Sequence, residues 1–181
     1  FKMLGGSITN NVQDAYTGGG GVYVGSSTFE MGGDAVISGN SMTVKTSQYV
    51  PGSAGAGGVY VEYGTFIMRD NAKITDNTVT IADNTRDTGS GGVYVRAQGA
   101  MTVSGNVTIT GNKDKTGTER DSNVYLTEDK VITVADALAG TASMGVTTAA
   151  APSDAAPVTI ATAAGAWIQN GNFTPDDTRF Y

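Results

Sequence analysis

Apolar and polar residues alternate along this chain in short stretches that recur. In residues 57–77, apolar side chains occupy every second position of three segments, 59–61, 65–68 and 72–75. Such alternation is typical of β-strands with one buried face. Glycine, asparagine and aspartate separate the segments, as expected of turns. The pattern therefore predicts three short strands in each repeat, and it argues against helix because no stretch holds a period of about 3.6 residues.

The repeat consists of two blocks. The first is Gly-Gly-Val-Tyr-Val, which recurs in altered form as Ser-Asn-Val-Tyr-Leu, and its copies are residues 20–24, 57–61, 91–95 and 122–126. The second follows the pattern F-x-M-x-x-x-A-x-I-x-x-N, and its copies are residues 29–40, 66–77 and 101–112. Copies that begin 31 to 37 residues apart predict a solenoid, in which each repeat buries its apolar face against its neighbours.

Stacked coils would bring equivalent residues into ladders about 4.8 Å apart. The inward positions are apolar in every copy, and the expected ladders are Val22–Val59–Val93–Val124, Val24–Val61–Val95–Leu126, Phe1–Phe29–Phe66–Met101, Met3–Met31–Met68–Val103 and Ile8–Ile37–Ile74–Ile109. A slip of one residue would turn a whole ladder outward, so this regularity fixes the register. We therefore expect an all-β protein, a parallel β-helix with three short strands per coil.

The repeat also suggests how the chain is organised. Residues 1–126 are expected to form the coils, the first of them partial because Phe1 matches Phe29 in mid-repeat, as in a piece of a longer protein. Residues 127–181 are expected to form the last coil and a C-terminal cap, since an open end exposes unpaired backbone groups. The aromatic residues expected to close that end are Trp167, Phe173, Phe180 and Tyr181.

At the N-terminal end we expect an exposed strand edge, with Phe29, Met31 and Ile37 as exposed ladder ends and self-association through this edge. Between the repeats, the inserts at residues 41–56, 78–90 and 113–121 differ in length, whereas the coils do not. All inserts leave the coil at one corner, which is where solenoids usually carry a binding surface.

Composition narrows the functional classes. The chain has 26 glycines, no cysteine, no histidine and a net charge of −6. The absence of cysteine excludes disulfides and thiolate metal ligands, and the absence of histidine removes the commonest general base and zinc ligand. An acidic chain without a cluster of lysines and arginines is not expected to bind nucleic acid. No apolar run reaches the roughly 20 residues that a membrane-spanning helix needs. We expect no metal site and no cofactor.

A row of tyrosines is the candidate binding site. Its members, on the opposite side of each strand from the flanking valines, are Tyr23, Tyr60, Tyr94 and Tyr125. Outward tyrosines could bind a glycan or a protein, because they offer contact area and a hydroxyl at low entropic cost. Alternatively, they stack across strands and stiffen the sheet beneath the variable inserts.

A second polar row consists of Asn11, Asn40, Asn77 and Asn112. We expect these amides to bond one another and to cap turns rather than to bind a ligand.

The acids form no convincing catalytic site, although hydrolases and lyases also use β-helices. A glycosidase needs two carboxylates across one substrate site, and the outward strand positions offer no such pair. Asp34, Asp70 and Asp76 lie beside glycine or asparagine and are interpreted as turn residues. The nearest approach to a lyase site is the loop segment with Asp83, Arg86 and Asp87. We expect no enzymatic activity and name no catalytic residue.

The blocks GG-V-Y-V, G-T-F-x-M and I-[ST]-x-N resemble bacterial cell-surface repeat proteins with right-handed parallel β-helix folds. More distantly, they resemble the passengers of polymorphic outer-membrane autotransporters, which carry a tetrapeptide of the GGA-I type and an F-x-x-N tetrapeptide. The resemblance covers about residues 1–134 and implies a right-handed coil, export to the bacterial cell surface, and structural or adhesive work with a protein or glycan partner. The alternative is a fragment of a carbohydrate-active β-helix, a polysaccharide lyase or glycosidase, whose active site lies outside this segment.

Overall fold

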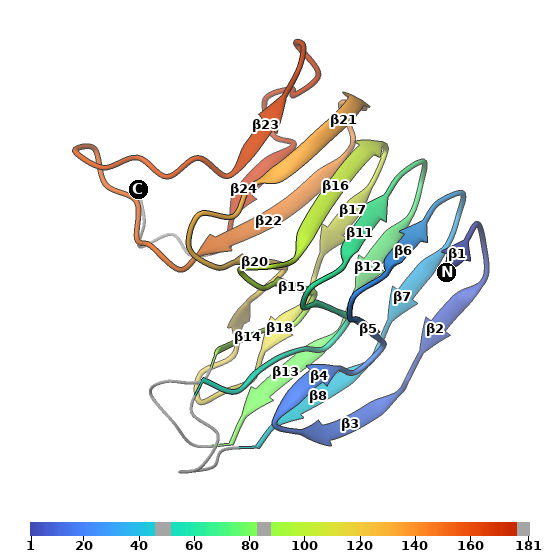
Figure 1. The fold of residues 1–181 in the computed structure, drawn as a ribbon, viewed down its shortest axis with the longest axis vertical. Helices are drawn as coiled ribbons and strands as arrows, with labels where there is room; N and C mark the ends of the chain where they lie inside the picture. Colours follow the sequence, from blue (N-terminus) through green and yellow to red (C-terminus); the bar gives the residue numbers. More distant parts are fainter. Residues whose placement is uncertain (46–51, 83–87, 177–181) are drawn as a thin grey trace.

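The computed structural model describes residues 1–45, 52–82 and 88–176. Within these ranges the protein is all-β, and its strands pair almost entirely in parallel, in curled sheets (Figure 1). The colours run in sequence order across the stack, so successive repeats lie side by side. This arrangement is compatible with the predicted solenoid class. Within the described ranges, no helix has the length and apolar character needed to cross a membrane.

The first sheet carries the phenylalanine and methionine ladders. Its strands are, in spatial order, β1 (Lys2–Met3), β6 (Thr28–Met31), β11 (Thr65–Met68), β16 (Ala100–Gly105), β21 (Ile132–Leu138) and β23 (Ala161–Ala163). Phe66 pairs with Phe29 on one side and with Met101 on the other, which confirms the predicted register. The rings stack along the ladder, with centroids 5.8 Å apart for Phe1–Phe29 and 5.5 Å apart for Phe29–Phe66.

The second sheet contains both remaining strand types of the repeat. Its order is β2 (Ser7–Thr9), β7 (Val36–Ser38), β12 (Lys73–Thr75), β17 (Thr108–Thr110), β22 (Ser143–Thr148), β20 (Val124–Leu126), β15 (Val93–Val95), β10 (Val59–Val61) and β5 (Val22–Val24), and β24 (Phe173–Pro175) pairs with β22. Strand β22 joins the two halves, since Met144 pairs with Ile109 and Val146 pairs with Val124. The isoleucine strand of one repeat therefore runs in line with the Val-Tyr-Val strand of the next.

The inserts leave the coil between these two strands, and they fold into strands of their own. The third sheet contains β3 (Val12–Ala15), β8 (Ser41–Val44), β13 (Thr78–Ile81), β18 (Lys113–Asp114) and β19 (Arg120–Asp121). The fourth contains β4 (Thr17–Gly19), β9 (Ala54–Ala56) and β14 (Thr88–Ser90). We call these two sheets the side lobe. Met42, Val44 and Val79 give it a small core separate from that of the coils. The described parts of the inserts thus add strands to the stack.

The asparagines form the predicted amide ladder inside the coils. Asn77 is fully buried, and its Oδ1 accepts from the backbone nitrogen and the Nδ2 of Asn40 at 3.0 and 2.9 Å. Its Nδ2 donates to the carbonyls of Ile37 and Thr75, both at 3.0 Å, and to Asn112 Oδ1 at 2.9 Å. Every polar atom of the buried amide is thus satisfied, as a buried amide requires.

The Gly-Gly pairs are explained by this ladder. A Cβ placed on Gly58 would lie 2.6 Å from the carbonyl oxygen of Gly92 and 3.3 Å from Nδ2 of Asn77. The backbone of each coil passes so close to the next coil, and to the amide beneath it, that a side chain has no room.

The two ends of the stack differ from each other. Phe29, Met31 and Ile37 are at most 3% exposed. The expectation that they are exposed ladder ends is therefore wrong, because β1 and β2 cover them with Phe1, Met3 and Ile8. The exposed apolar side chains at this end are Phe1, Leu4 and Val12. At the other end Trp167 and Phe173 pack against the core, as predicted, whereas Phe180 and Tyr181 lie outside the described residues.

Candidate functional site

The four tyrosines form one stacked row along the second sheet. Tyr60 pairs with Tyr23 on one side and Tyr94 on the other, and Tyr94 pairs with Tyr125. Successive ring centroids are 5.9, 5.4 and 5.1 Å apart, and the interplanar angles are 9°, 17° and 10°. The predicted alignment of the row is confirmed, and the cross-strand stacking that we weighed against binding is present.

Only one end of this row is well exposed. Tyr23 is 51% exposed, whereas Tyr60 and Tyr94 are 0% and 4% exposed. The expectation of four outward, accessible tyrosines must be corrected, because the side lobe folds back over them. Ala54 and Ala56 of β9 pack against the Tyr60–Tyr94 part of the row, and Tyr125 is partly buried beside it. A binding surface on the intact fold can therefore use Tyr23 but not Tyr60 or Tyr94.

Polar side chains of successive coils hold the tyrosine hydroxyls. Glu62 and Arg96 follow their Val-Tyr-Val strands directly, so the backbone register places each one coil further along the stack than the tyrosine it contacts. The Tyr23 hydroxyl donates a hydrogen bond to Glu62 Oε2. Arg96 Nη1 donates to Glu62 Oε1 at 2.7 Å and to the Tyr60 hydroxyl oxygen at 3.5 Å. The exposed Tyr23 ring is consequently fixed by its hydroxyl as well as by stacking.

The environment keeps these phenols protonated. The hydrogen bond to Glu62, together with partial burial, raises the pKa of Tyr23. Burial raises the pKa of Tyr60 to about 12 and also raises the pKa values of Tyr94 and Tyr125. At neutral pH the four phenols are therefore uncharged, and the ring that the row exposes most is that of Tyr23.

An open hollow lies beside Tyr23. Its volume is about 490 Å³, and it is lined by Gln13, Thr17, Gly18, Tyr23 and Glu62. Tyr23 belongs to β5, the edge strand of its sheet, and among the described residues only Tyr60 stacks on its ring. The Tyr23 ring, which is 51% exposed, thus lies beside an amide, a hydroxyl and a carboxylate, and this combination is the candidate binding site.

Sequence reasoning identified Tyr23 but missed the residues around it. Glu62 and Arg96 could have been found, since both follow the Val-Tyr-Val block directly and carry opposite charges in successive repeats. Gln13 and Thr17 lie in β3 and β4, ahead of the first Gly-Gly-Val-Tyr-Val block, and no feature of the repeat pattern marks them.

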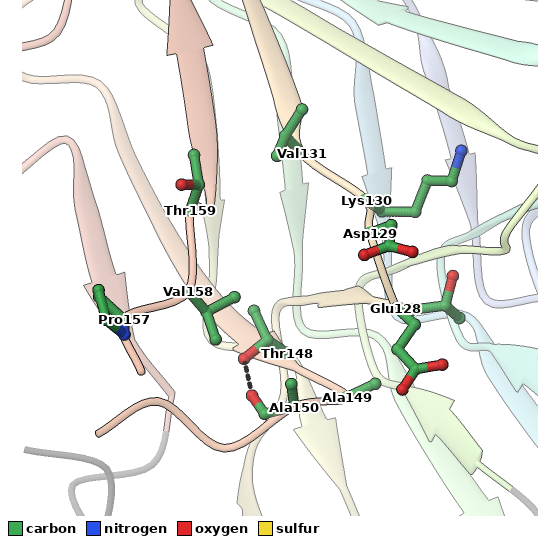
Figure 2. A pocket seen from close by; sticks show the side chains of 11 residues that line it. Glu128, Asp129, Lys130, Val131, Thr148, Ala149, Ala150, Pro157, Val158 and Thr159 are labelled. Atoms are coloured by element: carbon green, nitrogen blue, oxygen red, sulfur yellow. Dashed lines mark hydrogen bonds between the residues drawn. The ribbon is translucent and has the colours of Figure 1, made fainter. Parts of the chain in front are cut away.

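A larger hollow of about 680 Å³ lies near the C-terminal end of the stack (Figure 2). Three segments line it, residues 127–131, 148–150 and 157–159. Figure 2 shows Glu128, Asp129 and Lys130 along one side, and Thr148 Oγ1 donates to the Ala150 carbonyl at 2.6 Å. Its lining contains no aromatic side chain, and Glu128 and Asp129 are exposed. It therefore lacks the combination of ring face and polar groups that distinguishes the Tyr23 hollow.

The acids near the turns act as turn residues. Asp70 and Asp76 adopt left-handed backbone conformations, with φ of 60° and 58°, which aspartate tolerates at turns. Asp34 accepts a hydrogen bond from Asn71 Nδ2 at 3.2 Å. Asp83, Arg86 and Asp87 lie outside the described residues.

Comparison of the chain with protein-family models, with curated proteins and with solved structures finds no match.

Proposed function

We propose that this chain is a non-catalytic segment of a right-handed parallel β-helix at the bacterial cell surface, where it serves as a structural stalk with an adhesive surface. The observation that supports the proposal is the continuous parallel pairing of successive repeats, which stays in register except for a shift between Val103 and Gly105. One sheet continues from β1 to β23, and the isoleucine strands continue from β2 through β22 to β24.

The contacts between coils support a role as a rigid spacer. Neighbouring coils that carry strands of the side lobe are joined by parallel pairing in four sheets and by the buried amide ladder. Since each repeat contacts only its neighbours, repeats can be added to lengthen such a rod without changing its cross-section. These properties suit a protein that holds a binding surface away from a membrane. The cell-surface location rests on the resemblance of the repeat blocks to bacterial surface proteins.

The adhesive part of the proposal rests on the Tyr23 hollow. A preorganised aromatic ring with polar groups at its border suits a protein side-chain cluster or a glycan, because little conformational entropy is lost on binding. The side lobe contributes Gln13, Thr17 and Gly18 to this border.

Surface labelling tests the proposal. Antibodies against residues 1–126 should label intact cells of the source organism as strongly as permeabilised cells. Label that appears only after permeabilisation would contradict a surface location. A crystal structure with left-handed coils would contradict the proposed hand, and release of reducing or unsaturated sugars from polysaccharides by the full-length gene product would favour a carbohydrate-active enzyme.

A further inference from the structure

The fourth sheet ends one coil earlier than the sheets beside it. Three successive coils supply its strands β4, β9 and β14, and among the described residues the next coil adds none. In that coil the shortest insert, residues 113–121, folds back on itself, because β19 pairs antiparallel with β18 and Arg120 bonds Asp114 at 2.6 Å. The next coil itself is present, with β20 and β22, so the open position beyond β14 lies within the stack and not at a chain end.

A small hollow marks this open position. Its volume is about 110 Å³, and its lining includes Thr88 and Gly89 of β14, Arg120 of β19, and Tyr125 and Thr147 of the second sheet. The hollow therefore lies where a further strand of the fourth sheet would run, over the last tyrosine of the row.

The outer edge of β14 presents unpaired backbone groups to this hollow. Thr88 N donates to the Ser53 carbonyl at 3.2 Å, so Thr88 bonds the preceding coil. The Ser90 carbonyl accepts from Gly57 N at 2.9 Å and does the same. Alternate residues of a parallel strand bond opposite neighbours. The N–H and C=O of Gly89 therefore point away from β9, and no described strand pairs with β14 on that side.

The tyrosine in the hollow lacks the partner that the other tyrosines of the row have. Their hydroxyls each contact a polar side chain, and for Tyr94 this is Thr88 Oγ1 at 2.7 Å. Tyr125 stacks on Tyr94 and is partly buried, but no described group forms a hydrogen bond with its hydroxyl. A strand placed beyond β14, with threonine at the position of Thr88, would supply the missing partner.

The resident strands of the fourth sheet show which sequence fits such a position. A Cβ on Gly55 would lie 2.8 Å from Met42 Cγ, and a Cβ on Gly89 would lie 2.8 Å from Val79 Cγ2, so the middle residue has no room for a side chain. The flanking residues are small or threonine. The three strands read Thr17-Gly18-Gly19, Ala54-Gly55-Ala56 and Thr88-Gly89-Ser90.

We propose that the open position beyond β14 accepts an extended segment of a partner protein with the sequence pattern Thr-Gly-Ser, which pairs in parallel with β14 as a fourth strand. Backbone hydrogen bonds to Gly89 provide affinity, as in other cases of strand addition to a sheet edge. The central glycine and the threonine hydroxyl, which bonds Tyr125, provide specificity. This inference goes beyond the proposed stalk and does not involve the Tyr23 hollow.

The charges of the site favour an uncharged segment. Arg120 is paired with Asp114 at 2.6 Å, and Asp121 is paired with Lys113 at 2.9 Å, so the charged groups of the lining already have partners. A second copy of this chain is a poorer occupant, because its own strand of this sequence, β14, is already paired with β9.

A peptide titration followed by NMR tests the proposal. The probe is the blocked peptide acetyl-Ala-Thr-Gly-Ser-Ala-amide, added to the isotopically labelled chain. The amide signal of Gly89 should shift and saturate, with a Kd of about a millimolar because only a few backbone hydrogen bonds form. A control peptide with valine in place of glycine should bind about tenfold more weakly or not at all, since its side chain has no room.

Two variants of the protein test the hydroxyl contact. Tyr125→Phe should weaken the threonine peptide about threefold to tenfold, but it should not affect a peptide with alanine in place of threonine. Tyr63→Phe changes a tyrosine that is 56% exposed and does not line the hollow, and it should leave both affinities unchanged. The proposal is overturned if the Gly89 signal does not shift at several millimolar peptide, if the valine peptide binds equally well, or if Tyr125→Phe affects both peptides alike.

Discussion

The backbone nitrogen and the side-chain amide of Asn123 both donate to the carboxylate of Asp176, at 2.6 Å each. Asn123 stands where the earlier repeats have the second glycine of the pair, and its Oδ1 accepts from the backbone nitrogen and Nδ2 of Asn112 at 3.0 Å. The amide ladder, which advances by one asparagine per coil, therefore ends on an acid. Opposite it lies Gly145, where a Cβ would fall 2.0 Å from Asp176 Oδ1.

This ladder end should be sensitive to pH. Asp176→Ala leaves two donors of Asn123 unpaired and should lower the free energy of unfolding by about 1–3 kcal/mol. Burial raises the pKa of Asp176 above its ordinary value. A raised folded-state pKa means that the stabilisation is complete below the unfolded-state pKa and declines as pH rises through the folded-state pKa. The difference between wild type and Asp176→Ala, measured by urea unfolding, should thus be larger at acidic than at neutral pH. A larger difference at neutral pH would contradict this, and the exposed Asp154→Ala serves as the control.

The amide ladder should contribute strongly to stability. Asn77→Ala removes all hydrogen bonds of a fully buried amide and leaves donors of Asn40 without their acceptor. We expect a loss of about 3 kcal/mol or more in the free energy of unfolding, since each unsatisfied buried group costs about 1–3 kcal/mol. Asn11→Ala, at the exposed end of the same ladder, should cost less than about 1.5 kcal/mol. Equal losses for the two variants in denaturant titrations would show that the buried ladder does not matter.

The isoleucine ladder provides a test of core packing. Ile74 is fully buried between Ile37 and Ile109. Ile74→Ala should lower the free energy of unfolding by about 2–5 kcal/mol, the range for large-to-small changes in cores. Lys73→Ala, at the exposed neighbouring position of β12, should change it by less than about 0.5 kcal/mol. Thermal and urea unfolding of both variants would check the contrast, and a stable Ile74→Ala would refute the packing described here.

The buried tyrosines should make the fold alkali-sensitive. Burial disfavours the phenolate and raises the pKa of Tyr60 from its ordinary value of 10.0 to about 12 in the folded protein. Its stabilisation is complete below the unfolded-state pKa and is lost as pH rises through the folded-state pKa, in total about 2–3 kcal/mol. Tyr60→Phe should flatten this part of the stability profile, measured by urea unfolding at increasing pH, whereas Tyr63→Phe should not. Identical alkaline profiles for wild type and Tyr60→Phe would count against the prediction.

The N-terminal end should associate with itself. Strands β1, β2 and β3 are edge strands, and Phe1, Leu4 and Val12 are 80%, 54% and 78% exposed there. Unpaired strand edges beside exposed apolar groups promote pairing between molecules. Sedimentation velocity should reveal concentration-dependent association that Val12→Lys reduces, while Ile168→Lys, at an exposed site in the C-terminal part of the chain, does not. A monomer at all concentrations would refute this prediction.

The sequence by itself determined the strands, their register and the amide ladder. Each coil contacts only the next, so the side chain that a position meets is its own equivalent one repeat away. Phe66 therefore had to meet Phe29, and Asn77 had to meet Asn40 and Asn112. The sequence also indicates where the ladder ends, because asparagine replaces glycine at position 123. The hydrogen-bond partner of Asn123, Asp176, lies 53 residues further along the chain.

Only the tertiary structure decided which of the outward residues are accessible. Alternation tells which side of a strand a tyrosine occupies, but it does not tell which other strand covers that side. The pairing of β4, β9 and β14 into a sheet over the row buries Tyr60 and Tyr94, and the same lobe brings Gln13 and Thr17 beside Tyr23. These contacts join inserts of unequal length and unrelated sequence to the coil. Their geometry depends on how the inserts pack together, which no repeat pattern encodes.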